Sequence, residues 1–288
     1  GPGSGGDMTA AAGGKGGAGG VGGEGKGGEG AAGNQGGSAQ GGAGQGGSGG
    51  GVPGLVDAGL VARYFLDEAD SGQAAPLAED SGPHAFDLPI QYGPALSYTE
   101  LNGNRALAWN DLGSPACPLD FLDARLVAAL QSQQLTIEAV VAATAVNSNS
   151  LGSVVLSFDG PTDSDATGLR ILPTQLLFRW DGAPARYAST NVVGVGRVVL
   201  HAVVDTSLAE PERVAFFVDG VGVPSAPAGA APTGETAVSL SHALVLGNSQ
   251  FYDRNFVGQL YYAAIYATAL TSAEVSHNAA LLSANDDE

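Results

Sequence analysis

Hydrophobic side chains after residue 54 are grouped in short runs rich in β-branched and aromatic residues, with polar and glycine-containing segments between them. Runs of this length and composition predict β-strands. Three of them end in Asp-Gly, which tolerates the positive φ of a tight turn, and no alternation of strands with helices accompanies them. The pattern therefore predicts an antiparallel sandwich. The expected strands cover residues 60–66, 105–109, 135–141, 153–158, 175–180, 198–204, 214–218, 243–246 and 259–266.

Two segments have helical features instead. Residues 119–131 place three leucines at positions i, i+4 and i+8, which predicts one helical face. Near the C-terminus, Thr271-Ser272-Ala273-Glu274 fits a capping box in front of an apolar segment that runs to Leu282. We therefore expect a helix over 119–131 and a short C-terminal helix.

Composition divides the chain into two parts. Of its 46 glycines, 28 lie in residues 1–54, where almost no side chain can be buried to offset the entropy of ordering. Residues 1–4 have the sequence of a remnant left by a cleaved tag, and residues 5–54 read as a disordered tether that holds the rest away from a cell surface or another module. An ordered glycine-rich array is the alternative. Residues 55–288 are long enough for one sizeable domain.

Charge excludes several partners. Lys15 and Lys26 are the only lysines, so residues 55–288 carry nine arginines against 26 acidic residues, a net charge of −17. Such a domain repels phosphate backbones and anionic lipids, and the chain has no run of about 20 apolar residues that would span a membrane. The single cysteine, Cys117, cannot form an internal disulfide and is expected to be a small buried residue.

Eight segments stand in order along the chain at residues 60–72, 79–82, 135–139, 216–220, 246–248, 256–258, 265–266 and 269–275. Together they resemble the laminin-G-like, concanavalin A-like jelly-roll family. The resemblance implies an all-β, antiparallel jelly-roll β-sandwich with a short C-terminal helix. It also implies a non-catalytic extracellular or cell-surface module, secreted or anchored, that binds carbohydrate or glycoconjugate.

The resemblance also makes Asp80 a candidate calcium ligand. Several relatives hold a structural calcium ion between an Asp-Ser-Gly loop, here Asp80-Ser81-Gly82, and an acidic pair in the last strand. In this chain Tyr261 and Tyr262 stand where that pair is usual, so half of the expected ligand set is missing. Asp163 and Asp165 form a second acidic loop without the spacing of a known cation site.

Catalysis has little support in the sequence. Glycosidases with a related sandwich carry two carboxylates on one strand as Glu-x-Asp-x-x-Glu or Glu-x-Asp-x-Glu, whereas Glu138 is followed only by alanine and valine. The four histidines have no ligand spacing. We therefore predict that the protein is not an enzyme.

Sugar recognition needs aromatic rings beside polar groups, because a pyranose has an apolar face and a rim of hydroxyls. The segment 250–255 best meets this need, and Trp109 and the pair Trp180 and Tyr187 are further candidates. The alternative is that these rings only pack against apolar side chains at the edges of the sheets. A structural or protein-interaction domain is the competing interpretation of function. The predicted ligand-binding residues are Phe251, Tyr252, Asp253, Arg254, Asn255 and Trp109.

Overall fold

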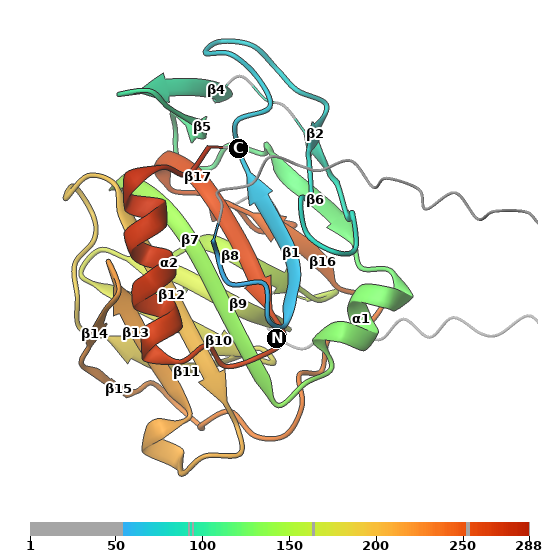
Figure 1. Cartoon of the computed structure of the whole chain (residues 1–288), viewed down its shortest axis with the longest axis vertical. Helices are drawn as coiled ribbons and strands as arrows, with labels where there is room; N and C mark the ends of the chain where they lie inside the picture. Colours follow the sequence, from blue (N-terminus) through green and yellow to red (C-terminus); the bar gives the residue numbers. More distant parts are fainter. Residues whose placement is uncertain (1–53, 92, 94, 163–164, 252–253, 288) are drawn as a thin grey trace, which may run out of the picture. The chain divides into compact units, whose positions relative to one another are not determined.

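The computed structural model describes residues 54–91, 93, 95–162, 165–251 and 254–287 (Figure 1). The predicted tag remnant (residues 1–4) and tether (residues 5–54) lie almost wholly outside this part of the chain and stay predictions, as does the domain boundary at residue 55. Within the described part, no helix is long and apolar enough to cross a bilayer.

Two antiparallel sheets confirm the predicted sandwich, and each expected strand is present (Figure 1). The first sheet has the order β14 (Val221–Val223), β13 (Val214–Val218), β12 (Val198–Asp205), β7 (Gln134–Ala145), β17 (Val257–Tyr266), β5 (Asn104–Trp109) and β4 (Leu96–Leu101), and β1 (Leu60–Phe65) pairs with β17. The second has the order β15 (Ser225–Pro227), β11 (Ala183–Ala188), β10 (Gln175–Trp180), β9 (Ala166–Leu172), β8 (Ser153–Asp159), β16 (Ala243–Leu246), β6 (Cys117–Phe121), β3 (Leu88–Gln91) and β2 (Leu77–Ala78).

Two of the three Asp-Gly pairs form the tight turns that were expected. Asp181 and Asp219 have φ values of 45° and 50°, and the glycine after each also has a positive φ. Each pair therefore reverses the chain between neighbouring strands. Asp159-Gly160 ends β8 without positive φ and leads into a longer loop.

The helix expected over 119–131 is only partly present. α1 covers Ala124–Leu130, because the Asp123 side chain accepts hydrogen bonds from the backbone N–H groups of Arg125 and Leu126 and caps the helix there. The residues before it form β6, which pairs with β16. α2, Ser272–Ala284, begins at the predicted capping box of Thr271 and Glu274, and a 3₁₀ turn covers Glu210–Glu212.

Apolar side chains pack on both faces of the first sheet. The inner face meets the second sheet in the main core, where Cys117 is buried as expected. The outer face is covered by α2, whose Val275, Ala279 and Leu282 pack against Val199 and Val203 of β12 and neighbouring side chains (Figure 1). Leucine, valine and alanine at helical spacing account for this packing.

A buried acid lies under this helix. Glu138 of β7 is fully buried, with Oε1 2.7 Å from Nε2 of His201, and its Oε2 accepts hydrogen bonds from the hydroxyls of Tyr262 and Tyr266 at 3.0 and 2.9 Å. Burial by itself would raise the pKa of Glu138, but the hydrogen bond and charge interaction with His201 outweigh it and hold the pKa below its ordinary value.

The same network reaches the start of the described chain. Arg63 donates from Nε to the Tyr262 hydroxyl, from Nη1 to Asp57 and from Nη2 to the carbonyl of Val56. Asn278 of α2 accepts from the backbone N–H of Val56. The residues that precede β1 are therefore held against α2 and Arg63 of β1 by partly buried polar contacts.

A second acid gives a pH-dependent prediction. Burial raises the pKa of Glu68 to about 7, although hydrogen bonds from the Tyr98 hydroxyl (2.5 Å) and the Glu79 backbone N–H oppose the rise. Because the folded state binds this proton more tightly than the unfolded state, the stability from Glu68 is fully present below its unfolded pKa of about 4.5 and is lost as the pH rises towards 7.

Glutamine resembles the protonated acid. We therefore expect the free energy of unfolding of Glu68→Gln, relative to that of the wild type, to be about 1–2 kcal/mol higher at pH 8 than at pH 5, after allowance for solvent screening. Urea denaturation at the two pH values measures this difference. An identical stability difference at both would contradict the raised pKa.

Candidate functional site

One row of directly opposed residues crosses the second sheet. Phe121 of β6 is directly opposite Ala243 of β16, which is opposite Asp159 of β8, which is opposite Ala166 of β9. Directly opposed residues of antiparallel strands point to the same face of a sheet. Only Phe121 of this row is exposed, at 56%, whereas Ala243, Asp159 and Ala166 are buried.

The segment after β16 is anchored along β8. The N–H of Gly247 donates to the carbonyl of Val155, and the N–H of Val154 donates to the carbonyl of Arg254 at 2.8 Å. Between these anchors, the N–H of Gln250 donates to Asp159 Oδ2 at 3.0 Å, and its side-chain amide donates to the carbonyl oxygens of Asp159 and Gly160. The predicted ligand loop thus lies against the end of β8.

The predicted loop residues have different surroundings. Phe251 is 43% exposed, whereas Arg254 and Asn255 are buried. Asn255 Oδ1 accepts hydrogen bonds from the N–H groups of Gly113 and Ser114, so its side chain secures the base of the loop. Tyr252 and Asp253 lie outside the described residues. The structure thus leaves the ring of Phe251 partly exposed and gives Asn255 an anchoring contact.

Trp109 does not lie on an accessible surface. It is 1% exposed, its indole Nε1 donates to the carbonyl of Ala116 at 2.8 Å, and its ring centroid is 5.5 Å from that of Phe256. A glycine is required at position 247, with φ of 70°, because a Cβ there would collide with the indole. These contacts describe a core residue rather than a sugar platform. Trp180 is likewise 5% exposed and part of the core, and Tyr187 is half-buried on β11.

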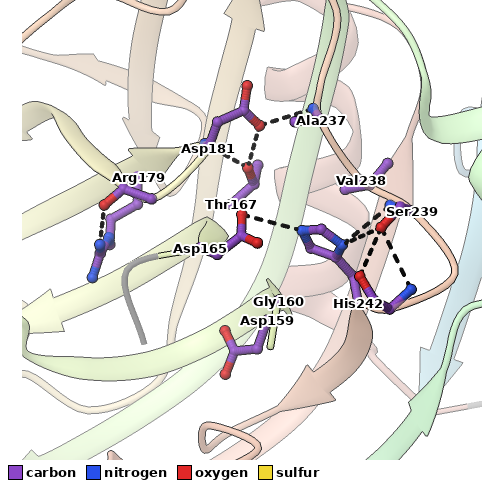
Figure 2. Close-up of polar contacts among 12 residues, drawn as sticks. Asp159, Gly160, Asp165, Thr167, Arg179, Asp181, Ala237, Val238, Ser239 and His242 are labelled. Carbon is purple, nitrogen blue, oxygen red and sulfur yellow. Dashed lines mark hydrogen bonds and ion pairs between the residues drawn. The ribbon is translucent and has the colours of Figure 1, made fainter. Parts of the chain in front are cut away.

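Polar side chains gather where β8 and β10 end and β9 and β16 begin (Figure 2). Asp165 faces the His242 ring, with Oδ1 3.4 Å from Nε2. Asp181 accepts hydrogen bonds from the backbone N–H of Ala237 and the hydroxyl of Thr167 through Oδ1. These contacts fasten the segment before β16 to the start of β9 and the end of β10.

Ser239, His242 and Asp165 stand in a line like that of a hydrolytic triad. The Ser239 hydroxyl is 3.0 Å from His242 Nδ1, whose ring reaches Asp165 through Nε2. However, the backbone N–H of Ser239 also donates to His242 Nδ1, at 3.1 Å, and the Ser239 hydroxyl lies 2.9 Å from that of Ser241. The nitrogen that would accept a proton is thus already used in closing a local turn.

Asp80 lies in a setting that does not fit a calcium ion. Its Oδ1 accepts from the backbone N–H groups of Arg63 and Gly82 at 2.8 and 2.7 Å, and its Oδ2 accepts from Phe86 at 2.8 Å. Three of about four lone-pair positions are therefore taken by donors, while calcium needs six to eight oxygen ligands. Across the part of the chain that the structure describes, no group of three or more His, Cys, Asp or Glu side chains could hold a metal ion.

Sequence reasoning missed one exposed aromatic ring, that of Phe121. Phe121 is 56% exposed at the end of β6. It was hidden in the segment expected to be helical, and the two-residue alternation of Cys117, Leu119 and Phe121 is the signal that would have placed it on a strand face.

The comparisons agree with the sandwich. The model of the concanavalin A-like lectin/glucanases superfamily matches residues 121–276. A search of curated protein sequences gives no match.

Two solved structures are similar in fold. A Trypanosoma rangeli sialidase in complex with the inhibitor DANA is 17% identical with a TM-score of 0.51, over 81% of this chain and 34% of the sialidase. Domain 4 of AbnA, an extracellular GH43 arabinanase of Geobacillus stearothermophilus in complex with arabinotriose, is 20% identical with a TM-score of 0.50, over 78% of this chain and all of that domain. This chain thus spans about a third of the length of the sialidase.

Proposed function

This chain belongs to the concanavalin A-like lectin/glucanases superfamily, and we propose that it is a non-catalytic module that binds carbohydrate or glycoconjugate outside the cell or at its surface. The observation that carries the proposal is the exposed ring of Phe251 on a loop whose base is fixed by buried hydrogen bonds. A rigidly held aromatic ring can stack on a pyranose without a large loss of entropy on binding.

Polar contacts hold the loop that carries Phe251 in place. Gln250 donates to the buried carboxylate of Asp159 and, through its side-chain amide, to the carbonyl oxygens of Asp159 and Gly160. Domain 4 of the arabinanase, matched over its full length, was solved with arabinotriose, which is consistent with a sugar-binding use of the fold. The glycine-rich residues before the sandwich would then serve as the tether.

The absence of catalysis is part of the proposal. Glu138, the acid in the strand segment that resembles the family, is fully buried and cannot meet a substrate. The only triad-like arrangement seen in the described residues is committed to a turn, with His242 Nδ1 accepting from the Ser239 backbone. Both observations favour recognition over hydrolysis.

A glycan array followed by calorimetry of the full chain tests the proposal. We expect Phe251→Ala to weaken binding of the selected glycan about tenfold or more, because it removes a stacking surface. Val221→Ala, a change at an apolar side chain 67% exposed on the other sheet, is the matched control and should bind like the wild type. A wild-type chain that binds no glycan would refute the function, and a Phe251→Ala chain that binds normally would refute the site.

A further inference from the structure

The chain enters the sandwich through β1, and β1 pairs with the strand that follows the ligand loop. β1 begins at Leu60 and lies antiparallel beside β17 (Figure 1). Among the described residues, β17 is the only strand with which β1 forms a ladder, and an isolated bridge joins Tyr64 to Asp80. The loop that carries Phe251 leads into β17, which begins at Val257. Tension between the N-terminal side of the sandwich and a ligand at this loop is therefore transmitted through the pairing of β1 with β17.

The two points of attachment lie at opposite ends of β17. Leu60 is opposite Tyr266, the last residue of β17, and Phe65 is opposite Tyr262 in the middle of the strand. Val257 is the first of the ten residues of β17, which span roughly 30 Å at about 3.4 Å per residue. Forces that pull Leu60 and Val257 apart therefore draw two antiparallel strands past each other along their axes, which is a shear load.

A shear load is shared by all the hydrogen bonds of a strand pair. The bonds between antiparallel strands are perpendicular to the strands, so a force along the strands acts on every bond at once. Here they extend from the pair of Leu60 and Tyr266 to the N–H of Leu66, which donates to the carbonyl of Tyr261 at 3.0 Å. A pull on Leu60 and Tyr266, which lie at the same end, would instead break the bonds one after another.

Side-chain hydrogen bonds also oppose the sliding of β1. Tyr64 is fully buried, and its hydroxyl donates to the carbonyl of Phe86 at 2.8 Å. On the other face of the strand, Arg63 Nε donates to the hydroxyl of Tyr262 in β17 at 3.2 Å. Both bonds would have to break before β1 could move along β17, so they add to the resistance of the backbone ladder.

The residues in front of β1 are fastened to α2. The backbone N–H of Val56 donates to Asn278 Oδ1 at 3.0 Å, and His277 Nε2 lies 2.8 Å from the carbonyl oxygen of Gly54. Leu55 is buried in the apolar cluster that also contains Val275, Ala279 and Leu282 of α2. Tension from the N-terminal side thus meets these contacts before it reaches β1.

We propose that the sandwich is a load-bearing module, in which tension between the glycine-rich tether and a ligand at Phe251 is carried in shear by β1 and β17. The inference rests on the proposed function and adds a mechanical role to it. A module that holds a glycan at a surface has to stay folded while the glycan and the surface are pulled apart. Survival under force depends on the rate of unfolding, which the shear arrangement lowers.

Single-molecule force spectroscopy of the full chain tests the proposal with two pulling directions. One handle is attached at the N-terminus in both cases. The second handle is attached through Phe251→Cys, which reproduces a pull from the ligand, or through Ala273→Cys, at an exposed residue in the first turn of α2, beyond the Tyr266 end of β17. Cys117 is buried and does not take up a handle. We expect a several-fold higher unfolding force for the pull at residue 251, and equal forces would overturn the proposal.

A matched pair of variants tests whether β1 carries the load. Tyr64→Phe removes the hydroxyl bond between β1 and Phe86, and Tyr98→Phe removes a buried hydroxyl from β4, which pairs only with β5 among the described strands. For the pull at residue 251, we expect a lower unfolding force in Tyr64→Phe and the wild-type force in Tyr98→Phe. The reverse result would overturn the proposal, and melting temperatures establish that each variant is folded.

Glycan binding separates this inference from the function on which it rests. A chain that binds its glycan in calorimetry but unfolds at equal forces in the two directions keeps the proposed function and loses the mechanical role. Failure of the wild type to bind any glycan overturns both, because no ligand then pulls at Phe251.

Discussion

Glu138→Ala is expected to lower the free energy of unfolding by about 3–5 kcal/mol, the usual cost of removing one partner of a buried charged pair. Removal of the carboxylate takes the acceptor away from His201 Nε2 and from the hydroxyls of Tyr262 and Tyr266, all of which are buried. None of these groups reaches water in the folded state, so each would lose a partner without replacement.

Urea denaturation followed by far-ultraviolet circular dichroism measures the effect, and Glu212→Ala, a change at an exposed acid in the 3₁₀ turn, is the control, with an expected change within about 0.5 kcal/mol. Because folding holds the pKa of Glu138 below its ordinary value, the stability that Glu138 contributes is present above its unfolded pKa and is lost as the pH falls through its folded pKa. The difference in free energy of unfolding between wild type and variant should therefore become smaller in acid. A loss below about 1 kcal/mol at neutral pH would show that the network is dispensable.

Trp109→Ala is expected to cost about 3–5 kcal/mol of stability, because it leaves a large cavity between the sheets and an unpaired carbonyl at Ala116. The indole also supports Phe256 and the root of the ligand loop at Gly247. Any loss of glycan binding should therefore accompany the loss of stability.

Denaturation and calorimetry on the same preparations distinguish a core role from a ligand role for this ring. Leu112→Ala, at a side chain 38% exposed in the loop after β5, is the control and should stay within about 0.5 kcal/mol of the wild type. A Trp109→Ala chain with wild-type stability and no sugar binding would restore Trp109 as a binding platform and contradict the packing described above.

The strands of the core could be predicted because their apolar runs are local. β7, β12 and β17 are long, almost wholly buried and rich in valine, alanine and tyrosine, so composition alone identifies them. Short peripheral strands such as β2, β14 and β15 have no comparable signal, because they exist only through pairing with a neighbour. The capping box of α2 could be read directly, since its two partners are three residues apart.

The segment 119–131 shows where local periodicity misleads. Its leucine spacing fits a helix, yet the first residues pair with β16, a strand more than a hundred residues later in the chain. Whether an aromatic side chain is buried or exposed also depends on residues far away in the chain. Nothing local distinguishes Trp109, which is buried by Phe256, from Phe251, which is exposed. Long-range pairing decided both outcomes.

By itself, the sequence determined the antiparallel sandwich, the C-terminal helix and the unfavourable charge for anionic partners, because hydrophobic alternation, capping residues and net charge are properties of neighbouring residues or of the whole composition. Only the tertiary structure decided that Asp80 is surrounded by N–H donors, that Glu138 and His201 form a buried pair, and that Trp109 is buried while Phe251 is exposed. Those relations join residues from distant parts of the chain, so they arise only when the sheets pair and pack.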